Sequence, residues 1–132
     1  MHILTIKIYY EDTDAQGVVY YANYLRFFER ARTEYLSDVG YEQRKLMEQG
    51  SIFVVRELGI KFKKPAYLDQ QIEVHTKIIK AGKVSFDFSQ KVFSNTGNLL
   101  CGGVIKCGCL DSKDFKPKTL PYELYQGMKS LL

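Results

Sequence analysis

Two carboxylates stand close to a glycine and to the start of an aromatic, helical segment. The stretch EDTDAQGVVYYANY, residues 11–24, places Asp12 and Asp14 shortly before Gly17 and leads into Asn23. A helix N-terminus carries unpaired N–H groups and a partial positive charge, which suit a developing oxyanion. A nearby carboxylate can act as general base on water, or as nucleophile, at an acyl carbon. The segment therefore fits hydrolysis of an activated acyl group, with Gly17 allowing a sharp turn between the two parts.

The same residue types also have an ordinary structural use. Aspartate and glycine before a helix are common loop and cap residues. No Ser-His-Asp arrangement and no metal-ligand spacing elsewhere in the chain competes with this segment. Composition and spacing alone therefore leave both interpretations open.

One amphipathic helix is predicted from Asn23 to about Val39. Asn23 is a plausible N-cap and Gly40 a natural stop. Bulky residues recur at spacings of three and four, which predicts a buried stripe, whereas the charged residues between them point elsewhere. The stripe consists of Tyr24, Phe27, Phe28, Ala31 and Tyr35, and the charged residues are Arg26, Glu29, Arg30 and Arg32.

The rest of the chain alternates as strands do. Strands are predicted over residues 2–10 and, after a short helix near 42–49, in four segments from Gly50 to Asp111, with turns at 80–83 and 94–98. The strand after Gly50 is predicted to place Val54, Leu58, Ile60 and Phe62 on one face, and Gly102 and Gly103 indicate close backbone approach. The tail from Pro121 could form a short helix. The fold class is therefore α+β, with a curved antiparallel sheet of about five strands wrapped around one long central helix.

Composition limits the remaining possibilities. The 132 residues suit one domain, 1–132, and the net charge of +4 is a mild bias compared with the dense basic stripe of a nucleic-acid binder. Cys101, Cys107 and Cys109 are predicted to be buried, reduced thiols, and no metal site is expected. No signal peptide or transmembrane segment is evident, so we expect a cytoplasmic protein.

The sequence resembles the hotdog-fold acyl-CoA thioesterases, in particular the Tol-Pal-associated (YbgC-type) and 4-hydroxybenzoyl-CoA thioesterase group. The resemblance covers nearly the whole chain. It rests on the motifs Tyr9-Tyr10-Glu11-Asp12-Thr13-Asp14, Gly17-Val18-Val19-Tyr20, Ala22-Asn23-Tyr24, Phe28-Glu29-Arg30-Ala31-Arg32, Phe53-Val54-Val55-Arg56 and Pro65-Ala66.

The resemblance implies a site and an activity. Asp14 matches the catalytic carboxylate, and the backbone N–H of Tyr21 matches the group that polarises the thioester carbonyl. Gly17, Val54 and Val55 match substrate-binding positions, and Lys83 and Ser85 align near positions that meet the coenzyme A phosphates. The implied substrate is a thioester of coenzyme A or acyl carrier protein, with no separate cofactor because coenzyme A is part of the substrate. The implied assembly is a homodimer or homotetramer.

Several alternatives stay open. Many YbgC-type members have His where this chain has Tyr21, and tyrosine, with an ordinary pKa of about 10, cannot replace imidazole near neutral pH. A hotdog hydratase would need a histidine beside an acid, and a noncatalytic acyl-binding or scaffold module would bind thioesters without turnover. Asp12 could support Asp14 or anchor the loop, and Glu29 could face the site or solvent. The lysines at 61, 63 and 64 could gather phosphate or form a solvated sheet edge.

Overall fold

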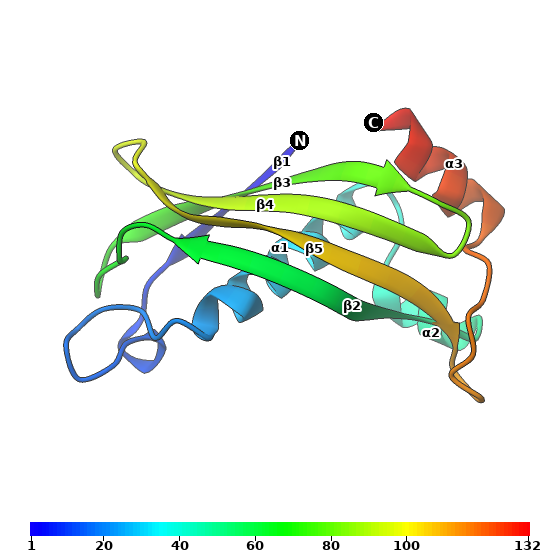
Figure 1. Cartoon of the computed structure of the whole chain (residues 1–132), viewed down its shortest axis with the longest axis horizontal. Helices are drawn as coiled ribbons and strands as arrows, with labels where there is room; N and C mark the ends of the chain where they lie inside the picture. The colour runs from blue at the N-terminus through cyan, green and yellow to red at the C-terminus, as the bar shows by residue number, and fades with distance from the viewer.

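A single antiparallel sheet covers one long helix (Figure 1). The computed structural model describes all residues from 1 to 132. Its strands lie in the order β1-β3-β4-β5-β2, so β1 and β2 form the two edges. The elements are β1 (His2–Lys7), η1 (Tyr10–Asp12), α1 (Asn23–Asp38), α2 (Gln43–Glu48), β2 (Ser51–Phe62), β3 (Gln71–Ala81), β4 (Ser85–Ser94), β5 (Leu99–Asp111) and α3 (Tyr122–Ser130). The predicted class, strand number and central helix are confirmed.

The aromatic stripe of α1 forms the centre of the core. All five predicted stripe residues are buried, and Phe27 and Phe28 are completely so. They face Phe86, Phe88 and Ile105 of the sheet, which are also buried. The Gln90 side chain fixes this contact, because its Nε2 donates to the backbone oxygen of Phe28 at 2.9 Å.

Two predictions about α1 are wrong. Asn23 is the first helical residue and Ala22 occupies the N-cap position, without a side-chain cap. The Asn23 amide instead donates to the backbone oxygen of Asp12 at 2.9 Å, so it ties the helix to the loop before it. Arg32 is only 7% exposed rather than on the polar side. Its burial is compensated because its guanidinium donates to Gln90 Oε1 at 2.9 Å and pairs with Glu29.

The prediction of one apolar face for β2 is wrong at Val54. A β-bulge between Val55 and Glu57 inserts Arg56 and reverses the alternation. Opposite residues of an antiparallel pair point to the same face. Val55 and Leu58 therefore face α1 with their partners Cys107 and Ile105, whereas Val54 pairs with Gly108 and points to the other face.

The three cysteines are buried free thiols, as predicted. Burial raises the pKa of Cys101 to about 12 and that of Cys107 to about 11, and it also raises the pKa of Cys109. The thiolate is the nucleophilic form, so none of the three suits nucleophilic catalysis near neutral pH. None of the helices has the length and apolar character needed to span a bilayer.

The close approach predicted at Gly103 can be tested by Gly103→Ala. A Cβ at this position would lie 2.2 Å from the Gly59 backbone oxygen, so the β2–β5 pair would have to separate. We expect a loss of about 1–3 kcal/mol in unfolding free energy, measured by urea denaturation. Gly59→Ala is the matched control, since nothing lies within 4 Å of its added Cβ. Equal midpoints for the two variants would contradict the packing described.

Cysteine burial can be tested by alkylation. At pH 8 a thiol with a pKa of about 12, such as Cys101, is roughly one part in ten thousand thiolate. Iodoacetamide should therefore leave the native protein unmodified in mass spectra, and labelling should accelerate as the pH rises toward the raised pKa. The same protein in denaturant should take up three labels, which serves as the control. Fast labelling of native Cys107 would show that it is open to solvent.

Candidate active site

Asp12 anchors the loop that leads into α1. Its carboxylate Oδ2 accepts a hydrogen bond from the Tyr9 N–H at 2.9 Å, and the residue is 7% exposed. Its backbone oxygen accepts from the Tyr20 N–H at 3.0 Å and from the Asn23 amide at 2.9 Å. Of the two roles considered for Asp12, these contacts describe the anchoring one.

Asp14 lies on the opposite arm of a short hairpin from the residues that begin α1. Its N–H donates to the Val18 oxygen at 2.9 Å, and Gly17, with φ +78°, closes the turn by donating to the Asp14 oxygen at 3.0 Å. The carboxylate accepts from the Gln16 N–H at 2.9 Å. Asp14 is half-buried. The Tyr20 N–H, next to the helix start, donates to the Asp12 oxygen. Asp14 lies two residues further along the same extended arm, which is about 7 Å from that point.

The two backbone N–H groups immediately before α1, those of Tyr21 and Ala22, are unpaired. The N–H groups of Asn23, Tyr24 and Leu25 donate to the oxygens three residues earlier, but those of Tyr21 and Ala22 have no acceptor within the chain. A helix start without a side-chain cap keeps such donors available to a ligand. The positive end of the helix dipole adds to their attraction for negative charge.

A cleft adjoins this helix start. It has a volume of about 240 Å³ and is lined by Val19, Tyr21, Tyr24, Phe62, Lys63, Lys64 and Pro65. The Phe62 ring lies 6.2 Å from that of Tyr21 and 5.7 Å from that of Tyr24, and it is half exposed. Asp14 is not among the lining residues. The contact between Phe62 and Tyr21 could not be predicted from the sequence, because only the fold brings the end of β2 to the start of α1.

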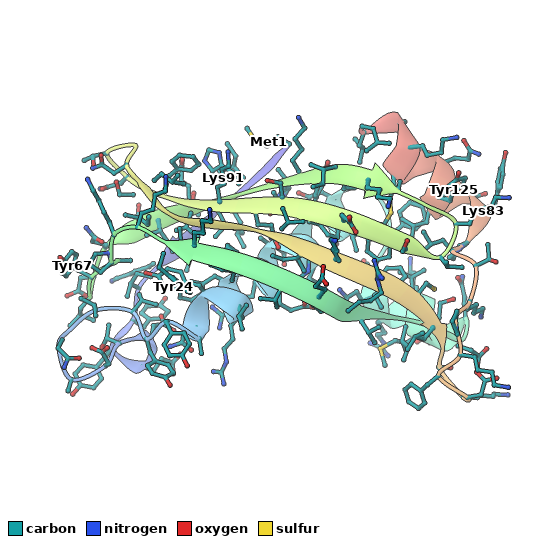
Figure 2. All side chains as sticks on the ribbon, in the orientation of Figure 1. Met1, Tyr24, Tyr67, Lys83, Lys91 and Tyr125 are labelled. Atoms are coloured by element: carbon teal, nitrogen blue, oxygen red, sulfur yellow. The ribbon has the colours of Figure 1, made fainter.

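The other predicted site residues lie at the opposite end of the sheet. Val54 and Ser85 both pair with Gly108, whereas Phe62 pairs with Cys101. Phe62 lies eight positions after Val54 along β2, a distance of about 25 Å. Figure 2 shows the same separation, with Lys83 at one end of the molecule and Tyr24 at the other. Within one chain, Asp14, Gly17 and Tyr21 lie in the loop segment that leads into α1, whereas Val54, Val55, Lys83 and Ser85 lie at the other end of the sheet.

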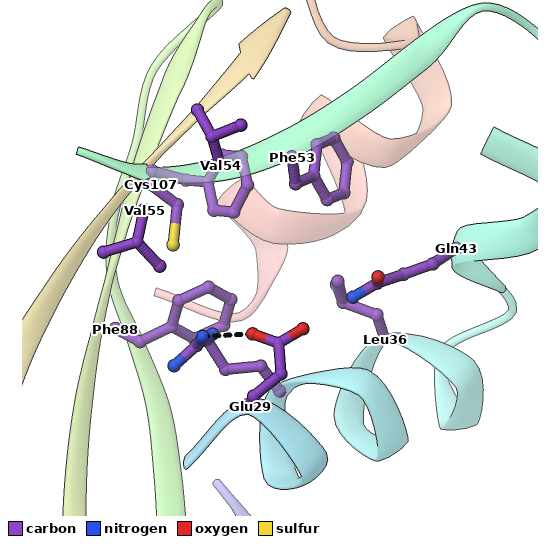
Figure 3. Close-up of a pocket in the computed structure, with 10 residues that line it drawn as sticks. Glu29, Leu36, Gln43, Phe53, Val54, Val55, Phe88 and Cys107 are labelled. Atoms are coloured by element: carbon purple, nitrogen blue, oxygen red, sulfur yellow. Dashed lines mark hydrogen bonds and ion pairs between the residues drawn. The ribbon is translucent and has the colours of Figure 1, made fainter. Parts of the chain in front are cut away.

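A narrow groove between α1 and β2 has both Val54 and Val55 among its lining residues (Figure 3). It holds about 30 Å³, and its walls are mostly apolar. Glu29 reaches into it from α1 and pairs with the buried Arg32 guanidinium, so its carboxylate is neither free nor fully solvated. Gln90 extends this network by donating to Thr76 Oγ1 at 2.9 Å. The sequence did not predict the Glu29–Arg32 pair at the edge of this apolar groove, because the helical pattern placed Arg32 on the polar side of α1.

The site contains no cluster of three or more His, Cys, Asp or Glu side chains with the spacing of a metal centre. His2 pairs with Asp38 and His75 with Glu73, so neither histidine belongs to the helix start. The groups available there for chemistry are therefore a carboxylate, unpaired amide donors, aromatic rings and lysines.

Known proteins are similar in sequence to this chain over almost its full length. The family description "Thioesterase-like superfamily" matches residues 9–128. The acyl-CoA thioester hydrolase YbgC of Escherichia coli is 38% identical over 124 residues, covering 94% of this chain and 92% of that protein. The acyl-CoA thioesterase YbgC of Haemophilus influenzae is 41% identical over 120 residues, covering 90% of this chain and 88% of that protein.

Solved structures agree with the sequence relatives. The DHNA-CoA thioesterase of Staphylococcus aureus superposes with a TM-score of 0.91 at 28% identity, covering 98% of this chain and 88% of that one. A hypothetical protein of Thermus thermophilus superposes with a TM-score of 0.94 at 27% identity, over the full length of both chains. Sequence and fold thus agree, and the chain belongs to the thioesterase-like superfamily of hotdog-fold thioester hydrolases.

Proposed function

We propose that this protein hydrolyses the thioester of an acyl-CoA, or of an acyl carrier protein, to a free acid and a thiol. The observation that carries the proposal is the pair of unpaired N–H groups at the start of α1, beside a loop that holds Asp14 in a fixed conformation. The names of the relatives in Escherichia coli and Haemophilus influenzae support the same reaction.

The proposed chemistry uses the helix start as the oxyanion site. The thioester carbonyl oxygen accepts a hydrogen bond from the Tyr21 N–H, and negative charge on that oxygen is stabilised by the helix dipole. In one route Asp14 removes a proton from water, the resulting hydroxide adds to the carbonyl carbon, and the C–S bond breaks to release a thiolate that takes up the proton. In the other route Asp14 itself attacks, the thiolate leaves, and water hydrolyses the anhydride.

The Tyr21 side chain is proposed to shape the site rather than to transfer protons. Its ring packs edge-on against Phe62, with an interplanar angle of 86°. Its phenol cannot act as an imidazole does near neutral pH. The backbone donor does not depend on the side chain, so Tyr in place of the His of many relatives keeps the oxyanion contact while removing side-chain proton transfer.

A homodimer is proposed to complete the site. The outer edge of β2 has no strand partner, and Val55, Leu58 and Phe62 on it are 43%, 42% and 51% exposed. Pairing two copies of β2 antiparallel about a two-fold axis would satisfy this edge. It would also lay the Val55 end of one chain beside the Phe62 end of its partner. The catalytic group of one chain and the groove of the other would then form one site.

The carboxylate role can be tested with Asp14→Asn. The substitution keeps the shape and the contact with the Gln16 N–H but removes the base, so thioester hydrolysis should fall by about 10²–10⁴ with unchanged folding. Thiol release from acyl-CoA, followed with a thiol reagent, measures the rate. Glu11→Gln is the matched control, since Glu11 is exposed in the same loop and its side chain makes no hydrogen bond within the chain. Unchanged activity of Asp14→Asn would refute the proposed mechanism, and tight acyl-CoA binding by a wild-type protein without turnover would indicate a binding module.

The shared site can be tested by mixing two inactive variants. Asp14→Asn removes the base, and Val55→Trp fills the groove that the partner's substrate would need. After the two variants are unfolded and refolded together, about a quarter of the sites should combine an intact Asp14 with an intact groove. Activity of about that fraction of wild type is expected, and each variant refolded alone is the control. Continued inactivity of a mixture that forms dimers by size-exclusion chromatography would place the complete site within one chain.

A further inference from the structure

A second pocket adjoins the groove between α1 and β2. It is formed by α2 and the start of β2, and its volume is about 160 Å³, whereas the groove holds about 30 Å³. The residues that line the pocket are mostly apolar: Gln43, Leu46, Met47, Ser51, Ile52 and Phe53. Gln43 and Phe53 also line the groove, so these two side chains form the wall between the two spaces.

Each side chain of this wall is held in place by a contact within the chain. The Phe53 ring lies 5.0 Å from the buried Phe86 ring, at an interplanar angle of 72°. The Gln43 amide Nε2 donates to Thr33 Oγ1 at 3.2 Å, and this bond ties the first residue of α2 to α1. The wall is therefore built from two separate elements, and neither side chain can swing aside without losing its partner.

The wall closes one end of the groove. Figure 3 shows Gln43 and Phe53 at that end and Val55 toward the other, where Val55 is 43% exposed. Along α1 the groove extends from Glu29 to Leu36, which lie seven residues apart, about 10 Å along the helix axis. The groove is therefore short, and the larger apolar pocket lies on the other side of its closed end.

The length of the groove matters if it holds the acyl group, as in the two-chain site proposed above. Each methylene group that is buried against apolar side chains strengthens binding about fourfold. A methylene that is pressed against a fixed side chain is instead unfavourable, because a packed site has no room for added volume. The wall thus sets the point at which a longer acyl chain stops gaining affinity.

We propose that Gln43 and Phe53 limit the length of the acyl chain that this enzyme accepts, and that its substrates are therefore short-chain acyl thioesters. This inference rests on the proposed thioester hydrolysis, and it adds the residues that select the acyl group. The wall acts on acyl binding and leaves the carbonyl chemistry at Asp14 and Tyr21 unchanged.

The test measures kcat/KM for straight-chain acyl-CoAs of increasing length with the wild type and with Gln43→Ala. Alanine removes the side chain that separates the two spaces and joins the groove to the pocket beside it. In the wild type kcat/KM should pass through a maximum and fall as the chain lengthens. In Gln43→Ala the maximum should move by at least two carbons, and acyl groups of that greater length should gain about tenfold.

Gln49→Ala is the matched control, because it removes the same side chain at the other end of α2, where Gln49 lines neither space. It should keep the wild-type maximum. Gln43→Met refills the wall without the amide and should return the maximum to the wild-type length, since the limit is steric. Phe53→Leu opens the wall from β2 and should move the maximum in the same direction as Gln43→Ala. A folded Gln43→Ala or Phe53→Leu protein with an unchanged maximum would overturn the proposal.

Calorimetry with S-alkyl-CoA thioethers of the same chain lengths, which cannot be hydrolysed, separates the two proposals. In the wild type the affinity should rise with chain length and then level off, and in Gln43→Ala it should continue to rise. This pattern would support the wall even in a protein that turns over no thioester. Thioester hydrolysis with the same length profile in both proteins would contradict the wall and leave the proposed function standing.

Discussion

The burial of one aromatic helix against one curved sheet governs the rest of this structure. The sheet presents Phe86, Phe88 and Ile105 to Phe27 and Phe28, and none of these side chains is more than 1% exposed. Burying an aromatic or large aliphatic side chain contributes about 1.5–3 kcal/mol, so this contact outweighs the charged groups on the same helix. It also fixes the direction of α1, and the helix start therefore lies where β2 ends (Figure 1).

The polar groups inside this core are arranged around the same contact. Gln90 is completely buried, and its amide joins the Phe28 backbone, Thr76 and Arg32. An unpaired amide or guanidinium in this position would be costly, so the network specifies one registration of α1 on the sheet. It also holds the Glu29 carboxylate at the edge of the groove. The core and the groove beside β2 thus share a single set of contacts.

The loop before α1 is held against this frame by hydrogen bonds. Asp12 accepts hydrogen bonds on both its side chain and its backbone, so the loop is anchored at the helix while the Gly17 turn presents Asp14. The helix start lacks a side-chain cap, which leaves amide donors free for a ligand. The members of the site are held by backbone hydrogen bonds rather than by contacts between their own side chains. For this reason the Tyr21 N–H does not depend on the side chain at that position.

The sequence by itself determined the fold class, the extent of α1 and its buried stripe, because periodicities of two and 3.6 residues report directly on burial. It also placed Asp14, Gly17 and Tyr21 in one segment before α1, since these residues are neighbours along the chain. Features that depend on pairing could not be read in this way. The bulge at Arg56 turned Val54 away from α1. Arg32 occupies a helix position that the sequence pattern assigns to the solvent-facing side, but it is buried because it donates to Gln90 of a distant strand. Only the tertiary structure decided that Val55, Lys83 and Ser85 lie about 25 Å along the sheet from the helix start, because distance across a sheet is set by strand register and not by order in the chain.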